Sequence, residues 1–365
     1  MLICRVCFAM DVSYPMKAPA KRSQRFFRTL LLTILATSLP SASLGKSSDT
    51  ALQLIDRMGK AAESLNYRGV FVYLRNSRLK AVQVIHKVDE YGEHERLVSL
   101  NGMPREIIRN NELVTCILPE DKAVLVDEHR YPDKAVVARS KSFRSNNGLS
   151  RRLPAKLKAM REHYQFSLGK PDRIAGRETQ QVVIVPRDQY RYGYHLWIDR
   201  ETGLLLKTVM TEDGGQILEQ MMFTSLLLPA KIPDTELVPT VAGREFSWRE
   251  GESLSMDPDN HESKWKIGWL PAGFALVAHS RDLLPNSQAP VEHMVYSDGL
   301  SSVSIFIEPV RHTKRSHLSG FSSMGAVNAY GTIQALHYLT LVGEVPHITV
   351  ERMGKSIRYL SSNTD

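Results

Sequence analysis

A group of basic side chains between residues 139 and 161 is the part of this chain best suited to bind an anion. The stretch holds eight lysines and arginines and no aspartate or glutamate. Such groups bind phosphate oxygens by charge-assisted hydrogen bonds, so a clamp for an anionic lipid or an acidic partner segment is one interpretation and a solvated loop is the other. The candidate clamp residues are Arg139, Lys141, Arg144, Arg151, Arg152 and Lys156.

The chain offers no residue set that fits an enzyme or a metal site. Gly320 to Gly325 reads GFSSMG, in which the glycines do not lie two residues either side of one serine, as a nucleophile elbow requires. We interpret this segment as a flexible turn before a strand. His261 and Glu262 begin a zinc-protease motif, but Trp265 stands where the second histidine should be. We therefore expect no catalytic residue, no metal and no cofactor. His86 is interpreted as a hydrogen-bonded structural histidine.

The N-terminus has the three parts of a secretory signal peptide, which we assign to residues 1–43. Four basic residues at 21–28 precede a mostly apolar stretch at 29–39, and Ser41 and Ser43 supply small residues before a cleavage site. Because a membrane span takes about 20 apolar residues, we expect a soluble exported protein. Met16 is a more ordinary start than Met1, and the sequence leaves the true start open.

Cleavage of this leader changes the charge balance. The whole chain has 47 basic and 39 acidic residues, and residues 1–43 hold six of the bases and one of the acids. The mature chain would therefore carry a net charge of only +3. A nucleic-acid binder usually has a strongly basic domain, so that class is excluded as a partner of this chain.

The order of apolar segments predicts two structural units. Residues 52–65 have helical spacing, and five short segments between 68 and 128, parted by turn residues, predict an antiparallel meander. Further strand patterns follow at 180–185, 194–199, 204–210 and 217–225, which closes a first domain at 46–228. Residues 229–243 are proline-rich and are interpreted as a linker. Strand patterns and an amphipathic helix at 346–360 predict a smaller α+β domain at 244–360.

Several stretches within these units resemble the MucB/RseB family. The N-terminal ones are LNYRGVFVYL at 65–74, IHKVDEYGEHERLVSLNGMPREIIR at 85–109 and VTCILPEDKAVLVDE at 114–128. The C-terminal ones, in the family's order, are WLPAGF, YSDGLSSVSIFIEP, GAVNAYG and VGEVPHITVERMGKSI, between residues 269 and 357. The resemblance implies an α+β protein with a half-open antiparallel β-barrel like that of lipoprotein carriers, with helices, then a linker and a smaller α+β domain. Periodicity alone does not distinguish an open barrel from a sandwich.

The resemblance also implies a function. It is that of a non-enzymatic periplasmic envelope-stress sensor, which binds the periplasmic domain of a membrane anti-sigma factor and protects it from regulated proteolysis. The C-terminal domain, with its edge facing the linker, would be the main binding site for this periplasmic domain, the tail of the anti-sigma factor. A ligand of lipid type, lipopolysaccharide or another acyl lipid, would occupy the barrel and weaken this grip. The competing function is a periplasmic carrier of lipid or lipoprotein, and the oligomeric state, including a homo-oligomer, stays open.

Four strand residues are candidates to line an acyl-chain cavity in such a barrel: Phe71, Tyr73, Met221 and Phe223. Each buried methylene contributes about 0.8 kcal/mol, so roughly ten of them would give micromolar affinity before ordering costs. An ordinary packed core is the alternative, because alternating apolar strands commonly face one.

Overall fold

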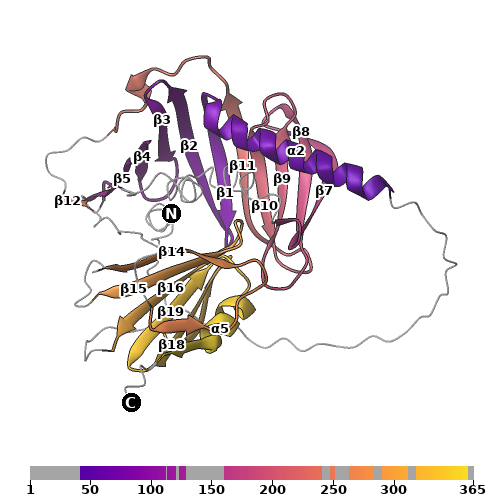
Figure 1. Ribbon diagram of the computed structural model, residues 1–365. Helices are drawn as coiled ribbons and strands as arrows, with labels where there is room; N and C mark the ends of the chain where they lie inside the picture. The colour runs from indigo at the N-terminus through magenta and orange to yellow at the C-terminus, as the bar shows by residue number, and fades with distance from the viewer. Residues whose placement is uncertain are drawn as a thin grey trace.

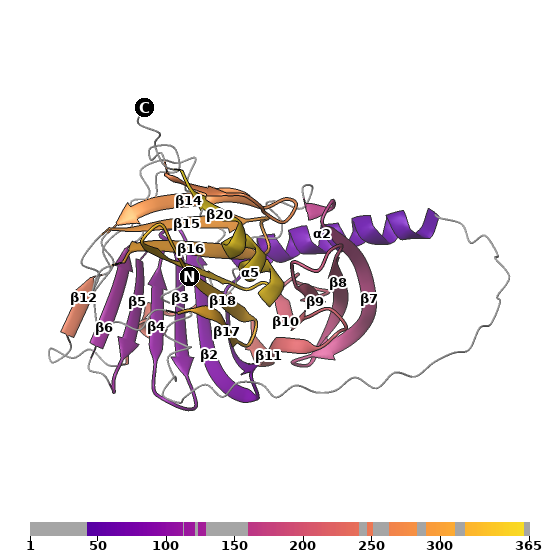
Figure 2. The ribbon, with the colours of Figure 1, turned by 90° about the horizontal axis from the view of Figure 1, so that it is seen from below.

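The computed structural model describes residues 42–111, 113–120, 123–128, 160–240, 247–250, 263–282, 290–310 and 318–360. They form a large N-terminal sheet crossed by one long helix and a smaller C-terminal sheet with a short helix on one face (Figure 1). The view from below shows the C-terminal sheet in front of the N-terminal strands (Figure 2).

The first part of the large sheet is the expected meander, with one strand more than the five predicted segments. Six strands pair antiparallel in sequence order, each with the next. They are β1 (Tyr67–Arg75), β2 (Arg78–Asp89), β3 (Gly92–Ser99), β4 (Glu106–Asn110), β5 (Leu113–Leu118) and β6 (Ala123–Glu128).

The second part of the large sheet returns to the first through its last strand. The strands are β7 (Tyr164–Ile174), β8 (Arg177–Pro186), β9 (Gly193–Asp199), β10 (Leu205–Thr211) and β11 (Ile217–Leu227). β11 pairs antiparallel with β1, and β12 (Ser247–Glu250) adds to β6 in parallel. β7 and β12 are the two edges, so the sheet is not closed and the predicted half-open antiparallel architecture is confirmed.

Helix α2 (Ala42–Ser64) lies across the second part of this sheet (Figure 1). Ala51, Ile55 and Met58 are spaced four and three residues apart, so they share one face of the helix. All three are fully buried, and they pack with apolar side chains of β7 to β10, including Phe166 and Leu196. The helix therefore holds the curled end of the sheet.

The C-terminal domain is a six-stranded antiparallel sheet in the order β14-β15-β16-β19-β18-β17. Helix α5 packs on one face with Trp265, Met294 and Ile305 in its core. Its elements are β13 (Trp265–Ile267), β14 (Ala275–Asp282), β15 (Val291–Ser297), β16 (Ser302–Pro309), β17 (Gly320–Met324), β18 (Val327–Gln334), β19 (His337–Gly343), α5 (His347–Ser356) and β20 (Ile357–Tyr359), of which β13 and β20 form a separate pair.

Two local predictions in this domain differ from the structure. The helix expected to reach residue 360 ends at Ser356, and Ile357 begins strand β20, because its side chain enters the core and the next residues pair with β13. The segment GFSSMG, interpreted as a turn before a strand, instead forms strand β17, paired with β18. Among the described residues, no helix combines the length and apolar character that crossing a membrane requires.

Candidate functional site

The four cavity candidates lie together on one face of the β1–β11 pair. Phe71 is the register partner of Phe223, and Tyr73 that of Met221, two residues further along both strands. Phe223 is only 5% exposed and contacts Phe71 edge to face, with 5.8 Å between ring centroids. The structure thus brings the four residues together on packed apolar surface. That they line a ligand cavity stays a prediction.

A charged group borders this apolar surface at the end of the two strands. The Tyr73 hydroxyl donates a hydrogen bond to the Glu219 carboxylate, and Nε of Arg75 lies 3.1 Å from Oε1 of the same carboxylate. The Arg75 guanidinium also donates to the carbonyl oxygen of Met324, at 2.6 Å, at the end of β17. Arg75 therefore joins the candidate lipid-binding face to the C-terminal domain.

His86 occupies the structural role that the sequence predicts. Its ring is fully buried and stacks on Tyr67, with 4.7 Å between centroids. Nδ1 lies 2.8 Å from the carbonyl oxygen of Leu65, just after α2, and Nε2 lies 3.0 Å from a carboxylate oxygen of Glu93. These bonds tie the end of the helix to β2 and β3, so the interpretation of His86 as a hydrogen-bonded structural histidine is confirmed.

The two domains meet at a buried ion pair. Arg191, in the loop between β8 and β9, and Asp298, in the turn after β15, both have fully buried side chains, and Nη1 of Arg191 lies 2.7 Å from Oδ2 of Asp298. The guanidinium also donates to Asp188 and to the carbonyl oxygen of Ala272. The Tyr164 hydroxyl donates to Asp298 at 2.9 Å, and burial, followed by the nearby carboxylate, raises the pKa of that hydroxyl well above its usual value.

A second set of contacts joins the two domains beside the Arg191–Asp298 pair. The side-chain amide of Asn328 donates to the Tyr192 hydroxyl at 2.9 Å, and the Thr349 hydroxyl donates to the carbonyl oxygen of Tyr190 at 2.8 Å. The Arg352 guanidinium lies over the ring of Trp269, 4.1 Å from its centroid, and donates to the Tyr190 hydroxyl. The loop between β8 and β9 thus contacts both α5 and the sheet that α5 covers.

The first part of the predicted linker lies against the outer face of the meander. Asp234 and Glu236, in the short 3-10 helix η2 (Asp234–Glu236), form ion pairs with Lys87 and Arg68. Arg96 donates to the carbonyl oxygen of Glu236 at 2.9 Å. Because side chains alternate along a strand, these basic residues lie on the face opposite Tyr67 and His86. Residues 229–240 are therefore fixed to the N-terminal sheet.

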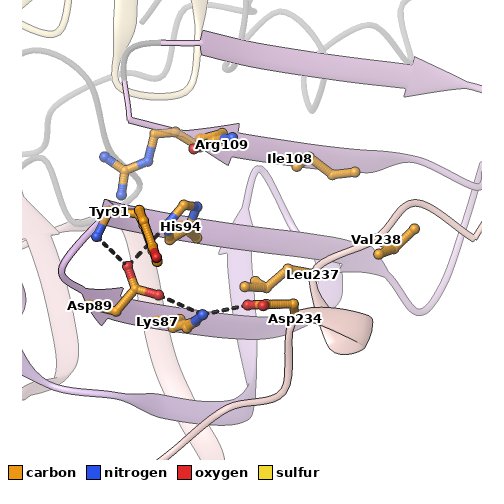
Figure 3. Close-up of a pocket in the computed structure, with 10 residues that line it drawn as sticks. Lys87, Asp89, Tyr91, His94, Ile108, Arg109, Asp234, Leu237 and Val238 are labelled. Atoms are coloured by element: carbon orange, nitrogen blue, oxygen red, sulfur yellow. Dashed lines mark hydrogen bonds and ion pairs between the residues drawn. The ribbon is translucent and has the colours of Figure 1, made fainter.

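A pocket of about 290 Å³ opens between this segment and the β2–β3 hairpin (Figure 3). Lys87 lies at its floor between Asp234 and Asp89, and the hydrogen bonds to these two carboxylates raise the pKa of the ammonium group. Leu237 and Val238 form an apolar wall. All charges named here already have partners, so the geometry assigns the pocket no ligand.

One histidine of the C-terminal sheet is held in its neutral form. His293, on β15, is 8% exposed and stacks parallel to Phe306, with 4.3 Å between ring centroids. Burial, followed by repulsion from His279, lowers the pKa of His293 to about 4.

Replacing His293 by phenylalanine is expected to make the protein less sensitive to acid. The unfolded chain, with an ordinary histidine pKa of 6.5, binds a proton before the folded chain does at about 4, so stability falls as the pH drops between these values. At pH 5 this linkage costs about 2 kcal/mol in the parent protein. Urea unfolding at pH 7 and pH 5 measures it. If the free energy of unfolding falls equally in the parent and in H293F between pH 7 and pH 5, the ring of His293 is not buried in its neutral form.

Comparison with known proteins decides the family. The model of the MucB/RseB N-terminal domain matches residues 50–241, and that of the MucB/RseB C-terminal domain matches residues 259–358. The chain belongs to the MucB/RseB family. The Sigma factor AlgU regulatory protein MucB of Pseudomonas aeruginosa is 30% identical over 341 residues, covering 91% of this chain and 98% of that protein. The Sigma-E factor regulatory protein RseB of Haemophilus influenzae is 27% identical with the same coverage.

Solved structures of MucB resemble both domains of the chain together. The complex of P. aeruginosa MucA and MucB has a TM-score of 0.63 at 28% identity, and MucB in complex with MucA(peri) has a TM-score of 0.61 at 27% identity. Each match covers 86% of this chain and all of the solved chain. The family that the sequence resembled is therefore confirmed, and with it the division into a large and a smaller sheet domain.

Sequence reasoning found one part of the candidate site and missed another. The six basic clamp candidates, Arg139, Lys141, Arg144, Arg151, Arg152 and Lys156, lie outside the described residues. The four apolar candidates come together, as stated above. The Arg191–Asp298 pair was missed, although Asp298 lies in the family-like stretch YSDGLSSVSIFIEP, where an acidic turn residue at the end of a strand was the available signal.

Proposed function

We propose that this chain is a periplasmic, non-enzymatic regulator that binds the periplasmic part of a membrane anti-sigma factor and shields it from proteolysis. The observation that carries the proposal is the match of both family domains, in order, together with the likeness to MucB solved with MucA. Export by a leader at 1–43, a soluble mature protein and the division into domains at 46–228 and 244–360 around a linker are part of the same proposal.

The C-terminal domain is the proposed main binding site for the anti-sigma tail. Its strands β14 and β17 are the two edges of the six-stranded sheet, and an edge strand leaves main-chain groups available to a partner chain. Phe321 and Met324 on β17 and Leu276 on β14 are exposed apolar side chains. These features support a protein-binding role for the domain.

The proposed signal is a lipid that binds the N-terminal sheet. Phe71, Tyr73, Met221 and Phe223 would contact its acyl chain, and the basic stretch at 139–156 would bind its phosphates. A ligand changes tail binding only if it has unequal affinity for the two conformations, and a 100-fold preference is worth about 2.7 kcal/mol. Arg75 supports such coupling, because its guanidinium contacts both Glu219 and Met324.

The direct test measures protection of the tail. Purified mature protein, residues 44–365, is expected to bind the periplasmic part of the anti-sigma factor from the same bacterium and to slow its cleavage by the first regulatory protease. Added lipopolysaccharide should weaken the binding, and reversal of Arg151, Arg152 and Lys156 to glutamate should reduce that effect. Absence of tail binding by the mature chain would contradict the regulator.

The second candidate is a carrier of lipid or lipoprotein. The open N-terminal sheet alone would support it, since that function has no need of the C-terminal domain. Copurified acyl lipid, its transfer between vesicles, and no tail binding would together favour the carrier. The family match over residues 259–358 supports the regulator instead.

A further inference from the structure

The hairpin between β18 and β19 carries a leucine where the backbone disfavours one. Gln334 and His337 are register partners, so Ala335 and Leu336 form a two-residue turn, and their φ angles are 46° and 57°. Such turns favour asparagine and glycine, because a Cβ atom makes the left-handed backbone costly. The side chain of Leu336 is 79% exposed, so burial within the fold does not offset this cost.

Two other turns of the same kind use the favoured residues. Asn76 and Ser77, between β1 and β2, and Ala175 and Gly176, between β7 and β8, also have two positive φ angles. Each of these turns contains an asparagine or a glycine. Backbone strain that is kept at an exposed position indicates a role outside the packing of the domain. Leu336 is therefore a candidate contact residue.

The turn belongs to an end of the C-terminal domain that exposes several apolar side chains. The ring of His337 contacts those of Trp265 and Tyr359, with 5.2 and 6.2 Å between centroids, which places the turn beside the β13–β20 pair. Ile333, before the turn, is 60% exposed, and Leu360, after β20, is 50% exposed. Together with the leucine of the turn, they give this end three apolar side chains in solvent.

Three exposed cations accompany these apolar side chains: Lys264, Lys266 and Arg358. Lys266 and Arg358 are register partners in the β13–β20 pair. Because side chains alternate along a strand, the cations lie on the side opposite the packed rings of Trp265 and Tyr359. Within the described part of the chain, no acidic side chain pairs with any of the three. Their charge is therefore available to an anionic partner.

This end lies at the opposite end of its strands from the N-terminal domain. β18 begins beside the contact between the domains, where Asn328 donates to Tyr192, and runs for eight residues before the turn. At about 3.3 Å per residue, the turn lies roughly 25 Å along the strand from that contact. We call Ile333, Leu336, Leu360 and the three cations the distal end. All six side chains are exposed, so a partner can reach them without displacing part of the fold.

An anionic membrane surface fits the chemistry of the distal end. Apolar side chains at a projecting turn can enter the boundary between headgroups and acyl chains, while lysine and arginine beside them stay with the phosphates. A protein partner would instead have to supply a pocket for the turn. We propose that the distal end of the C-terminal domain binds the anionic phospholipids of a bilayer surface. This contact goes beyond the proposed function, and it would hold the regulator at the membrane that contains its proposed partner.

Sedimentation of the mature full chain with lipid vesicles tests this proposal. Binding to vesicles of equal parts phosphatidylglycerol and phosphatidylcholine should exceed binding to phosphatidylcholine alone, and added salt should weaken it by screening the exposed charges. Leu336→Asn removes the apolar side chain and should weaken binding about tenfold. Its thermal midpoint should stay unchanged or rise, because asparagine tolerates the left-handed backbone.

Reversal of the three distal cations to glutamate should have a larger effect. Each cation near an anionic surface contributes about a fivefold gain in affinity, so the triple variant should bind roughly 100-fold more weakly. Leu227→Asn, which removes a leucine 59% exposed on β11, is the control for the turn. The charge control reverses three exposed cations of the N-terminal domain, Lys170, Arg173 and Lys231. Both controls should bind the vesicles as the parent does.

The outcomes separate this inference from the proposed function. A parent that does not bind anionic vesicles, or distal variants that bind as well as their controls, overturns the inference alone. Loss of tail binding by the distal variants without vesicles would identify a protein contact, which also overturns it. If the triple reversal lowers the thermal midpoint, Leu336→Asn decides. A parent that binds vesicles but not the anti-sigma tail contradicts the proposed function alone.

Discussion

Replacement of Arg191 by methionine is expected to lower the free energy of unfolding by about 3–5 kcal/mol. Methionine keeps much of the length of the side chain but leaves Asp298 as a fully buried carboxylate without its cation. It also removes the hydrogen bonds to Asp188 and Ala272, so the loss reaches both domains. Urea unfolding followed by tryptophan fluorescence measures the change.

Two variants make this test specific. Arg200→Met removes an exposed guanidinium 3.7 Å from Glu178, and a pair so exposed contributes at most about 1 kcal/mol. Adding Asp298→Asn to Arg191→Met removes the unpaired charge and keeps an acceptor for the amides of Leu300 and Ser301. The double variant should therefore lose less than the sum of the single losses. A loss below about 1 kcal/mol for R191M would show that the pair does not hold the domains together.

The buried joint limits how the domains can move. A ligand-driven separation at Arg191 and Asp298 would have to offset the cost of breaking this pair, whereas a rotation about it would not. Residues 229–240 of the predicted linker are themselves held to the N-terminal sheet through Asp234 and Glu236. We therefore expect a regulatory movement to rotate the domains about the Arg191–Asp298 pair. Such a rotation would change the contact between Arg75, at the end of β1, and Met324.

Regular alternation made the meander predictable from sequence. In β2, Val82 and Val84 enter the core while Gln83 between them is exposed, and such a period of two identifies a strand and its buried face. The strand β7 breaks the pattern, because its pairing with β8 is irregular between Leu168 and Pro171. An edge strand tolerates this proline, but its period is lost and the strand was not predicted.

The parts of the candidate site that could not be predicted depend on contacts between residues that are far apart in the sequence. Arg191 and Asp298 are 107 residues apart, and an arginine in a loop is normally solvated, so nothing local indicates that it is buried. The four apolar candidates were easier to find, since Phe71 and Tyr73 lie on one strand two residues apart. Their pairing with Phe223 and Met221 still depended on β11 returning to β1, which the order of strand patterns does not specify.

The second large effect is expected at Arg75. Substitutions there should lower the free energy of unfolding and also weaken the coupling between lipid binding and tail binding, and a second substitution should separate the two effects. Arg75→Met leaves the Glu219 carboxylate, 6% exposed, with only the Tyr73 hydroxyl as a donor among these contacts. Loss of one partner from so buried a pair should lower the free energy of unfolding by roughly 3 kcal/mol. It also removes the bond to the carbonyl oxygen of Met324, which links the candidate lipid face to the C-terminal domain.

The double variant Arg75→Met with Glu219→Gln isolates the second effect. Glutamine neutralises the buried charge and still accepts from Tyr73, so urea unfolding should show most of the lost stability restored. The bond to Met324 remains absent, so the fold-change in tail affinity caused by lipopolysaccharide should still shrink towards one, because coupling requires a contact that differs between the two states. Unchanged coupling in a stable double variant would place the path between lipid and tail elsewhere. Glu219→Gln alone, which keeps Arg75 and its bond to Met324, should retain the full response.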